Sequence, residues 1–139
     1  MNALTVKNPW AWFIAHGHKR IENRTWPTSY RGPLAIHAGK SADTLTAHTL
    51  DALRHLDIPV PRPSELAKGA IIGVVELVGC IELASAPDAL REDPWAQGPW
   101  LWILANARTV APIRYRGQLG LWTPDAATVA ALTRKVGAA

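Results

Sequence analysis

The stretch GAIIGVVELVGCIEL, residues 69–83, carries the strongest strand pattern in the chain. Its odd-numbered positions are all apolar apart from glycines, and a period of two is typical of a strand with one face in a core. Glycines within a strand favour bends and close approach of neighbouring backbones. The stretch therefore predicts a small, strongly curved sheet or barrel.

Working outward from this strand, the chain reads as an α+β fold with five or six strands, mostly in its second half. Further strands are expected over 19–25, 33–38, 99–108 and 118–124, and helices over 7–17, 41–56 and 125–135. Asn8, Ser41 and Asp125 are the expected helix caps. The Pro-rich segment 57–69 is too short for a domain linker, so we expect one domain over 1–139.

Composition indicates a globular protein with an anionic partner. Hydrophobic residues make up 48% of the 139 residues and charged residues 19%, with a formal net charge of +4. Nine Lys or Arg and five acids lie in residues 1–70, whereas residues 71–139 hold six of each. A basic excess on one side favours nucleic acid or nucleotide as partner. The alternative is that a pI of 9.6 is ordinary for a small protein.

Cysteine and histidine usage excludes several kinds of site. The single cysteine, Cys80, excludes a disulfide within the chain and a cysteine zinc cluster, and its apolar neighbours predict a buried, inert thiol. The histidines are not spaced as a metal set, and no cofactor is implied. No secretory signal or membrane-spanning segment is apparent, so we expect a soluble cytoplasmic protein without a membrane partner.

The segment KRIENRTWPTSYRG, residues 19–32, concentrates charge beside aromatic surface. Alternation along a strand places Glu22 and Arg24 on one face, with Lys19 at the strand entrance. If burial lowers the pKa of Lys19, this lysine would act as a general base; if its charge is kept, it would contact phosphate or form an ion pair. A salt bridge that fixes the strand is the alternative role for Glu22 and Arg24.

Basic and aromatic residues suggest how a nucleotide would be held. The expected phosphate contacts are Arg24, Arg31, Lys40 and Arg116, and the alternative for each is a solvated cation. Trp26 is the first candidate for base stacking and Trp10 the second, since bases stack on aromatic faces. Trp12, Trp102 and Trp122 are expected in the core.

The segment PWAWFIAHGHKRIENRTWPTSYRGPLAIHAGK, residues 9–40, resembles the N-terminal motif of the ASCH family, the activating-signal-cointegrator homology domain of the PUA-like superfamily. The family element G-x-K-x-x-E-x-R is met by Gly17, Lys19, Glu22 and Arg24. Further motifs follow in the family's order, so the resemblance covers about residues 5 to 124. It implies a PUA-like β-barrel flanked by helices, with a cleft floored by this strand.

The resemblance implies three activities, namely nucleic-acid binding, RNA cleavage and amide hydrolysis of N4-acylated cytidines. The leading interpretation is binding of a single-stranded or flipped-out nucleotide of RNA or DNA. The alternative is an enzyme, either a metal-independent ribonuclease using Lys19 and Tyr115 or a hydrolase using Lys19 and Glu76. Members with the hydrolase activity carry a nucleophilic Thr three residues after the lysine, where this chain has Glu22, and Thr25 is out of register.

A third interpretation is a protein-interaction module in which the Trp-rich strand over 99–108 meets a partner chain. The resemblance and the residues leave the identity of that protein partner open. A large exposed apolar patch away from the cations would favour this interpretation over the others.

Overall fold

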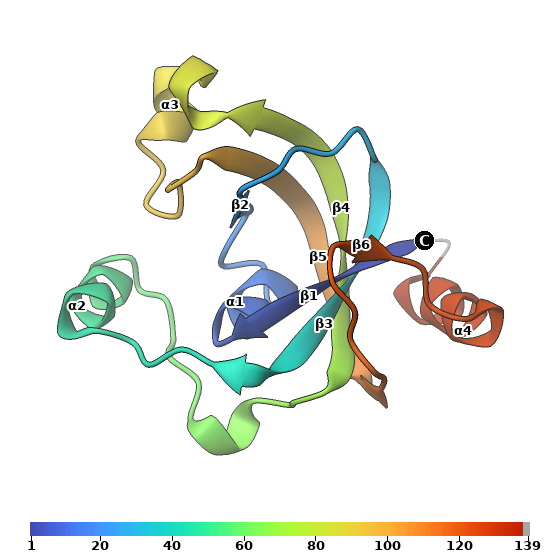
Figure 1. The fold of residues 1–139 in the computed structure, drawn as a ribbon. Helices are drawn as coiled ribbons and strands as arrows, with labels where there is room; N and C mark the ends of the chain where they lie inside the picture. Colours follow the sequence, from blue (N-terminus) through green and yellow to red (C-terminus); the bar gives the residue numbers. More distant parts are fainter. Residues whose placement is uncertain (138–139) are drawn as a thin grey trace.

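The computed structural model describes residues 1–137 as one curled, six-stranded sheet with helices on both of its faces (Figure 1). The strands are β1 (Asn2–Asn8), β2 (Ile21–Arg24), β3 (Gly32–Ala42), β4 (Ala70–Glu82), β5 (Trp100–Arg114) and β6 (Leu121–Trp122). The helices are α1 (Trp10–Ala15), α2 (Ala47–His55), α3 (Asp88–Arg91) and α4 (Ala126–Val136), with 3-10 turns at Pro63–Glu65 and Leu83–Ser85. The α+β class and the curved sheet are confirmed.

The strand order is β2-β5-β4-β3-β1-β6, which places β1 between β3 and the edge strand β6. β1 pairs in parallel with β3 and antiparallel with β6. The sequence pattern did not predict β1, because this strand ends at Asn8, inside the segment 7–17 that was predicted as a helix. Asn8 is the last residue of β1, and Pro9 occupies the cap position of α1. Three strands therefore lie in residues 2–42 rather than most of them in the second half.

The curl comes from the long antiparallel ladder between β4 and β5. This ladder runs from the pair Ala70 and Arg114 to the pair Glu82 and Trp100, and its register shifts at three points. At one shift the β5 residue Asn106 has a φ of 52°, in the left-handed region. Bulges bend a strand and increase its twist. The two strands therefore curve over their length and wrap the sheet into a half-barrel (Figure 1).

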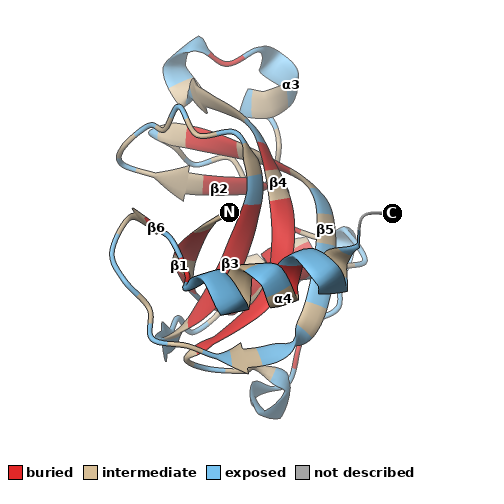
Figure 2. Cartoon of the chain, turned by 90° about the vertical axis from the view of Figure 1, so that its right-hand side faces the viewer, coloured by how far each residue is buried: buried red, intermediate tan, exposed pale blue. Residues whose placement is uncertain are grey.

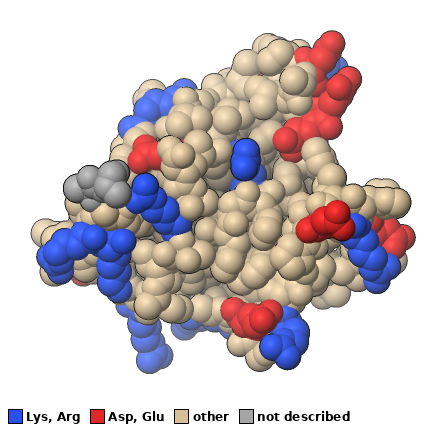
Figure 3. All heavy atoms as spheres, turned by 180° about the vertical axis from the view of Figure 1, so that it is seen from behind, with Lys and Arg blue, Asp and Glu red and all other residues tan. Residues whose placement is uncertain are grey.

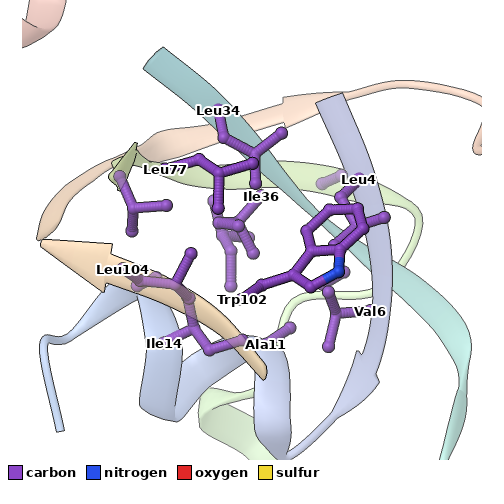
Figure 4. Close-up of a cluster of buried hydrophobic side chains, with 14 residues drawn as sticks. Leu4, Val6, Ala11, Ile14, Leu34, Ile36, Leu77, Trp102 and Leu104 are labelled. Atoms are coloured by element: carbon purple, nitrogen blue, oxygen red, sulfur yellow. The ribbon is translucent and has the colours of Figure 1, made fainter. Parts of the chain in front are cut away.

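Helix α1 packs on the inner face of the sheet, and Gly73 allows its close approach. A Cβ atom at Gly73 would lie 2.9 Å from the Ala15 Cβ and 2.9 Å from the Arg108 carbonyl oxygen. The core there joins α1 to β1, β3, β4 and β5, with Trp102 fully buried among aliphatic side chains (Figure 4). The Trp102 Nε1–H donates to the Trp26 carbonyl oxygen at 3.2 Å. Trp102 is thus a core residue, as predicted.

Helix α4 covers part of the outer face, where Ile71, Trp122 and Leu132 form a second buried cluster (Figure 2). Asp125 caps this helix, as predicted, and its side chain accepts from the Thr128 N–H at 2.7 Å. The Tyr115 hydroxyl donates to Asp125 Oδ2 at 3.2 Å. The end of β5 is therefore tied to the start of α4.

Helix α2 begins later than predicted and projects away from the sheet (Figure 1). β3 continues to Ala42, so Ser41 belongs to that strand, and Thr46 caps the helix by accepting from the Thr49 N–H. Leu53 is its one buried residue among those described, whereas Leu56 is 46% exposed.

Two further single-residue expectations differ from the structure. Cys80 is half-buried rather than fully buried. Trp12 is also half-buried and stacks on the exposed ring of His16, with ring centroids 4.0 Å apart, so it lies outside the core clusters. Within residues 1–137, every helix is too short or too polar to cross a bilayer.

Candidate functional site

A pocket of about 540 Å³ lies beside β2, where the charged residues of this strand meet two tryptophans. We call it the tryptophan pocket. Its lining residues are Thr5, Val6, Lys7, Trp10, Lys19, Glu22, Asn23, Arg24, Gly39, Lys40, Ser41, Trp95, Gln97, Gln118, Leu119 and Gly120. Lys19 and Glu22 are buried, at 5% and 7% exposure, so the pocket has a charged and desolvated floor.

The floor is a three-residue ionic network. Lys19 Nζ lies 3.1 Å from Glu22 Oε1, and Arg24 Nη2 lies 3.0 Å from Glu22 Oε2. Lys19 Nζ also donates to the Ile21 carbonyl oxygen, and Arg24 Nη2 donates to the Thr5 carbonyl oxygen at 3.0 Å. Glu22 and Arg24 face the same side, as strand alternation predicts. Both oxygens of Glu22 are therefore held by cations.

Burial perturbs the lysine of this network. Desolvation is the largest effect and lowers the pKa of Lys19, because the charged ammonium loses hydration. The attraction and hydrogen bond of Glu22 oppose this effect, and the positive charge of Arg24 adds to it. The result is a lysine that releases its proton more readily than an exposed one. Such a lysine suits either a directed hydrogen-bond donor or a proton acceptor.

Two indole rings border this floor. The rings of Trp10 and Trp95 have centroids 6.4 Å apart and planes at 79°, so the edge of one approaches the other. Trp10 Nε1 donates to Asp43 Oδ2 at 2.8 Å, which fixes that indole against the segment after β3. Lys19 Nζ lies 5.8 Å from the centroid of Trp95, within the range of a cation–π contact.

Asn23 holds the loop that carries Trp95. Its Nδ2 donates to the Trp95 carbonyl oxygen, and its Oδ1 accepts from the Gln97 and Gly98 N–H groups. Asn23 lies on β2 between Glu22 and Arg24. The same short strand therefore supplies the ionic floor with alternate residues and anchors one wall with the residue between them.

A second pocket of about 860 Å³ adjoins the first, and we call it the basic groove. Its lining residues are Thr5, His37, Gly39, Lys40, Lys68, Gly69, Arg114, Tyr115, Arg116, Gly117, Gln118 and Leu119. Thr5, Gly39, Lys40, Gln118 and Leu119 line both pockets. The loop after β5 thus forms the border between them.

The structure brings together some of the predicted site residues and separates others. Lys19, Glu22, Arg24 and Lys40 meet in the tryptophan pocket, and Lys40 also reaches the basic groove with Tyr115 and Arg116. The roles assigned to these residues stay predictions.

Trp26 and Arg31 line neither pocket. The Trp26 ring packs edge-on against Trp102 with centroids 4.8 Å apart, which joins it to the core. Arg31 is exposed, and its Nη1 donates to the carbonyl oxygens of Thr28 and Tyr30 within its own turn. Trp26 and Arg31 belong to the same charged segment of sequence as Lys19 and Glu22, yet their side chains do not reach the pockets.

Glu76 and Tyr115 are separated from Lys19. Val75 shares a hollow with Lys19, and Glu76 is the next residue along β4, so its side chain points to the opposite face of the strand. The Tyr115 hydroxyl is bonded to Asp125 at the start of α4. Neither group approaches the ionic floor in this arrangement, so the predicted catalytic pairs with Lys19 are not assembled here.

Sequence reasoning missed much of the pocket lining, including the two residues that build one of its walls. Trp95 lies in the loop DPWAQG (93–98), which carries no strand or helix pattern, and its contacts with Asn23, Trp10 and Phe13 bring it to the site. Asn23 sits inside the family element G-x-K-x-x-E-x-R at one of the unspecified positions. A polar, non-charged residue between two charged strand residues was the available signal for Asn23.

Comparison with known proteins gives consistent relatives. The family model described as "ASCH domain" matches residues 4–114. The chain is 30% identical over 132 residues, 88% of its length, to activating signal cointegrator 1 of Homo sapiens, and 35% identical over 83 residues, 56% of its length, to that of Mus musculus. It spans only 22% and 14% of the lengths of these two relatives.

Solved structures show the same fold. The crystal structure of ASCH from Zymomonas mobilis superposes with a TM-score of 0.54 at 14% identity, covering 92% of this chain and 90% of that one. A mutant of the same protein gives a TM-score of 0.54 at 13% identity, covering 94% and 96%. From the extent of the family match, the chain belongs to the ASCH domain family, which is PUA-like and associated with RNA binding.

Proposed function

We propose that the protein binds single-stranded nucleic acid and that the tryptophan pocket takes one unstacked nucleotide. The observation that carries this proposal is the buried Lys19–Glu22 pair beneath the rings of Trp10 and Trp95. A base is flat, apolar on its faces and polar at its edges. The pocket offers matching groups, with indole rings at its sides and hydrogen-bonding groups at its floor.

Stacking would supply much of the binding free energy. A base gains about 1–3 kcal/mol by stacking on an aromatic side chain in single-strand binding proteins. Because the two rings are nearly perpendicular, a base that stacks on one indole would meet the other at its edge. The Trp10 indole is bonded to Asp43, and the Trp95 indole packs against Trp10 and Phe13 on a backbone that Asn23 holds. Little conformational entropy would then be lost on binding.

Lys19 would read the edge of the base. Two of its three N–H donors go to Ile21 and Glu22 within the described chain, which leaves one for a ligand acceptor. Glu22 would orient Lys19 rather than contact the base, since Lys19 and Arg24 already hold both of its oxygens. Lys7 and Lys40, exposed at the rim, would contact phosphate.

The test is binding of labelled single-stranded RNA and DNA to wild type and to Trp95→Ala, followed by fluorescence anisotropy. We expect affinity to fall roughly 5- to 150-fold in Trp95→Ala, which corresponds to removal of one stacking interaction. Trp12→Ala is the matched control, because Trp12 is also half-buried but lies outside the pocket. Equal binding by wild type and Trp95→Ala would contradict the proposal.

A second candidate function is hydrolysis of RNA or of an acylated nucleoside at the same pocket. The lowered pKa of buried Lys19 favours it, because a lysine that deprotonates readily can serve as general base. The test is incubation of wild type and Lys19→Met with RNA and with N4-acetylcytidine. Turnover that is abolished in Lys19→Met would support catalysis. Turnover that survives the substitution would remove Lys19 from the mechanism, and no turnover in wild type would leave binding as the function.

A further inference from the structure

The basic groove differs from the tryptophan pocket in the state of its cations. Lys40, Lys68, Arg114 and Arg116 line it, and the lining residues include no acid. Within residues 1–137 none of these four side chains forms an ion pair, whereas Lys19 and Arg24 are both paired with Glu22. All four are exposed. The groove therefore presents uncompensated positive charge over a volume larger than that of the tryptophan pocket.

The register of the sheet brings these cations together at the ends of three strands, with Lys40 in β3, Lys68 just before β4, and Arg114 and Arg116 at and after the end of β5. Arg114, the last residue of β5, pairs with Ala70 at the start of β4. The Tyr115 N–H donates to the Gly69 carbonyl oxygen, and the Gly69 N–H donates to the Ala38 carbonyl oxygen of β3. The stem of Lys40 lies against Gly69, since a Cβ there would be 3.6 Å from Lys40 Cε. Backbone pairing thus fixes where the cations emerge.

A buried hydrogen-bond chain supports the floor of the groove. His37 is 2% exposed, and its Nε2 is 2.7 Å from the Tyr115 carbonyl oxygen, to which it donates. Its Nδ1 lies 3.2 Å from Thr5 Oγ1, and the Trp122 Nε1–H donates to the same hydroxyl oxygen. A Cβ at Gly117 would lie 2.8 Å from the His37 ring and 2.9 Å from Thr5 Oγ1. The loop therefore passes close over a fixed floor.

The two pockets adjoin, and an apolar side chain lies at their shared border. Leu119 lines both pockets and is 99% exposed, the highest value among the exposed large hydrophobic residues. A fully exposed leucine gains nothing from folding. At the border of an aromatic pocket and a cationic groove, it is positioned to pack against the apolar face of a base or sugar that crosses from one to the other.

We propose that the basic groove holds the backbone phosphates adjacent to the nucleotide in the tryptophan pocket, so that the ligand is a strand of several nucleotides and not a free nucleotide. This inference rests on the proposed function. Guanidinium groups match phosphate oxygens in geometry, and several such groups in one groove follow a polyanion rather than a single phosphate. The strand would pass over Leu119 between the two pockets.

The first experiment compares ligand lengths on the wild-type protein. Binding of a nucleoside monophosphate, a trinucleotide and an octanucleotide of one base composition is measured by calorimetry at fixed salt. We expect affinity to rise by at least about tenfold from the monophosphate to the octanucleotide, which is 1.4 kcal/mol. Equal affinity for the monophosphate and the octanucleotide would overturn the inference and leave the tryptophan pocket as a nucleotide site.

The second experiment tests the groove by salt dependence. On a single strand, each phosphate that a cation neutralises contributes about 0.7 to the slope of log K against log salt, so Arg114→Ala with Arg116→Ala should lower the slope by about 1.4. The same pair of substitutions should weaken binding of the monophosphate much less than binding of the octanucleotide, because Arg114 and Arg116 do not line the tryptophan pocket. An unchanged slope for the octanucleotide, in a variant with the wild-type circular dichroism spectrum, would overturn the inference.

The matched control is Arg134→Ala with Lys135→Ala in the last turn of α4. Seen from behind, basic side chains also gather at the side of the molecule where α4 lies (Figure 3). These cations lie outside both pockets, so we expect the slope to stay at its wild-type value. A slope that falls equally in both double variants would overturn the groove as the specific site. Absence of nucleic-acid binding at every length would instead overturn the proposed function itself.

Discussion

The side-chain amide of Asn23 is bonded to the backbone of Trp95, with Nδ2 donating to the carbonyl oxygen at 2.9 Å. Its Oδ1 accepts from Gln97 and Gly98, both at 2.8 Å. A single residue of β2 therefore fixes the loop over 95–98 that forms one side of the tryptophan pocket.

Replacing Asn23 by Ala should release this loop. Asn23 makes three hydrogen bonds to this loop, and each contributes about 0.5–1.5 kcal/mol, so we expect the free energy of unfolding to fall by about 1.5–4.5 kcal/mol in urea denaturation. Affinity for single strands should fall as well. Asn23→Asp keeps the acceptor for Gln97 and Gly98 but replaces the donor to Trp95 with a charged oxygen, so this substitution should weaken the loop as well. Wild-type stability in Asn23→Ala would contradict this account.

The two ends of the buried ion pair should respond unequally to substitution. Glu22→Gln leaves Lys19 and Arg24 without an anion, and breaking a buried pair this way costs about 3–5 kcal/mol. Lys19→Met leaves Glu22 paired with Arg24 and removes a desolvated ammonium, so its cost should be smaller. Chemical denaturation of both variants checks the order. Equal losses would show that Arg24 does not compensate Glu22.

Stability should depend on pH through Lys19. Because burial lowers its pKa in the folded state below the ordinary value of 10.5, the unfolded chain binds more protons between the two values. The contribution of Lys19 to the free energy of unfolding should therefore rise with pH across that alkaline window. The measurement is the free energy of unfolding of wild type and of Lys19→Met in urea at pH 7 and above. In the difference between the two proteins, the contributions of the other titrating groups cancel. A difference that stays flat up to pH 10.5 would contradict a lowered pKa.

The architecture was more predictable than the site because it depends on local patterns. Alternating apolar residues located β4, and an Asp before an apolar helix located the cap of α4. β1 was missed because its seven residues run directly into Pro9 and α1, and its pairing partners lie far along the chain. A two-residue strand such as β6 is defined by its partner and was predicted too long.

The site required tertiary information. The shared face of Glu22 and Arg24 follows from strand alternation, and the structure has them bonded. Trp26 follows Arg24 closely in sequence, yet its ring turns inward to Trp102. Trp95 has no charged strand residue near it in sequence, yet its loop is brought to β2. Which tryptophan borders the pocket is decided by long-range packing, and the residues of a single strand do not determine it.

Gly73→Ala should destabilise the fold by overpacking. The new Cβ would lie 2.9 Å from the Ala15 Cβ and from the Arg108 carbonyl oxygen, and a backbone atom in a ladder cannot move freely. We expect a loss of about 1–3 kcal/mol in the free energy of unfolding. In the control Gly79→Ala, the nearest atom is the Ile103 Cγ1 at 3.3 Å, and that side chain can shift. Gly79→Ala should therefore cost clearly less; the reverse order would refute the packing argument.

Acid should weaken the start of α4. Hydrogen bonds from Thr128, and then from Tyr115, lower the pKa of Asp125 below its ordinary value of 3.8. Its stabilising contribution is therefore present above that value and lost as pH falls through the lowered pKa. Asp125→Asn keeps a capping oxygen without the titration. Thermal unfolding midpoints of the two proteins should converge between pH 5 and pH 2, and a constant gap would exclude this role.

The tryptophan pocket takes its lining from separate stretches between Thr5 and Gly120, including β1, α1, β2, β3 and the loops around Trp95 and Leu119. No short fragment contains these groups together, so a ligand of the pocket has nothing to bind on the unfolded chain. By mass action such a ligand, at a hundredfold excess over its Kd, would add about 2.7 kcal/mol to the free energy of unfolding. Occupancy and cooperative unfolding are thus thermodynamically linked in this chain.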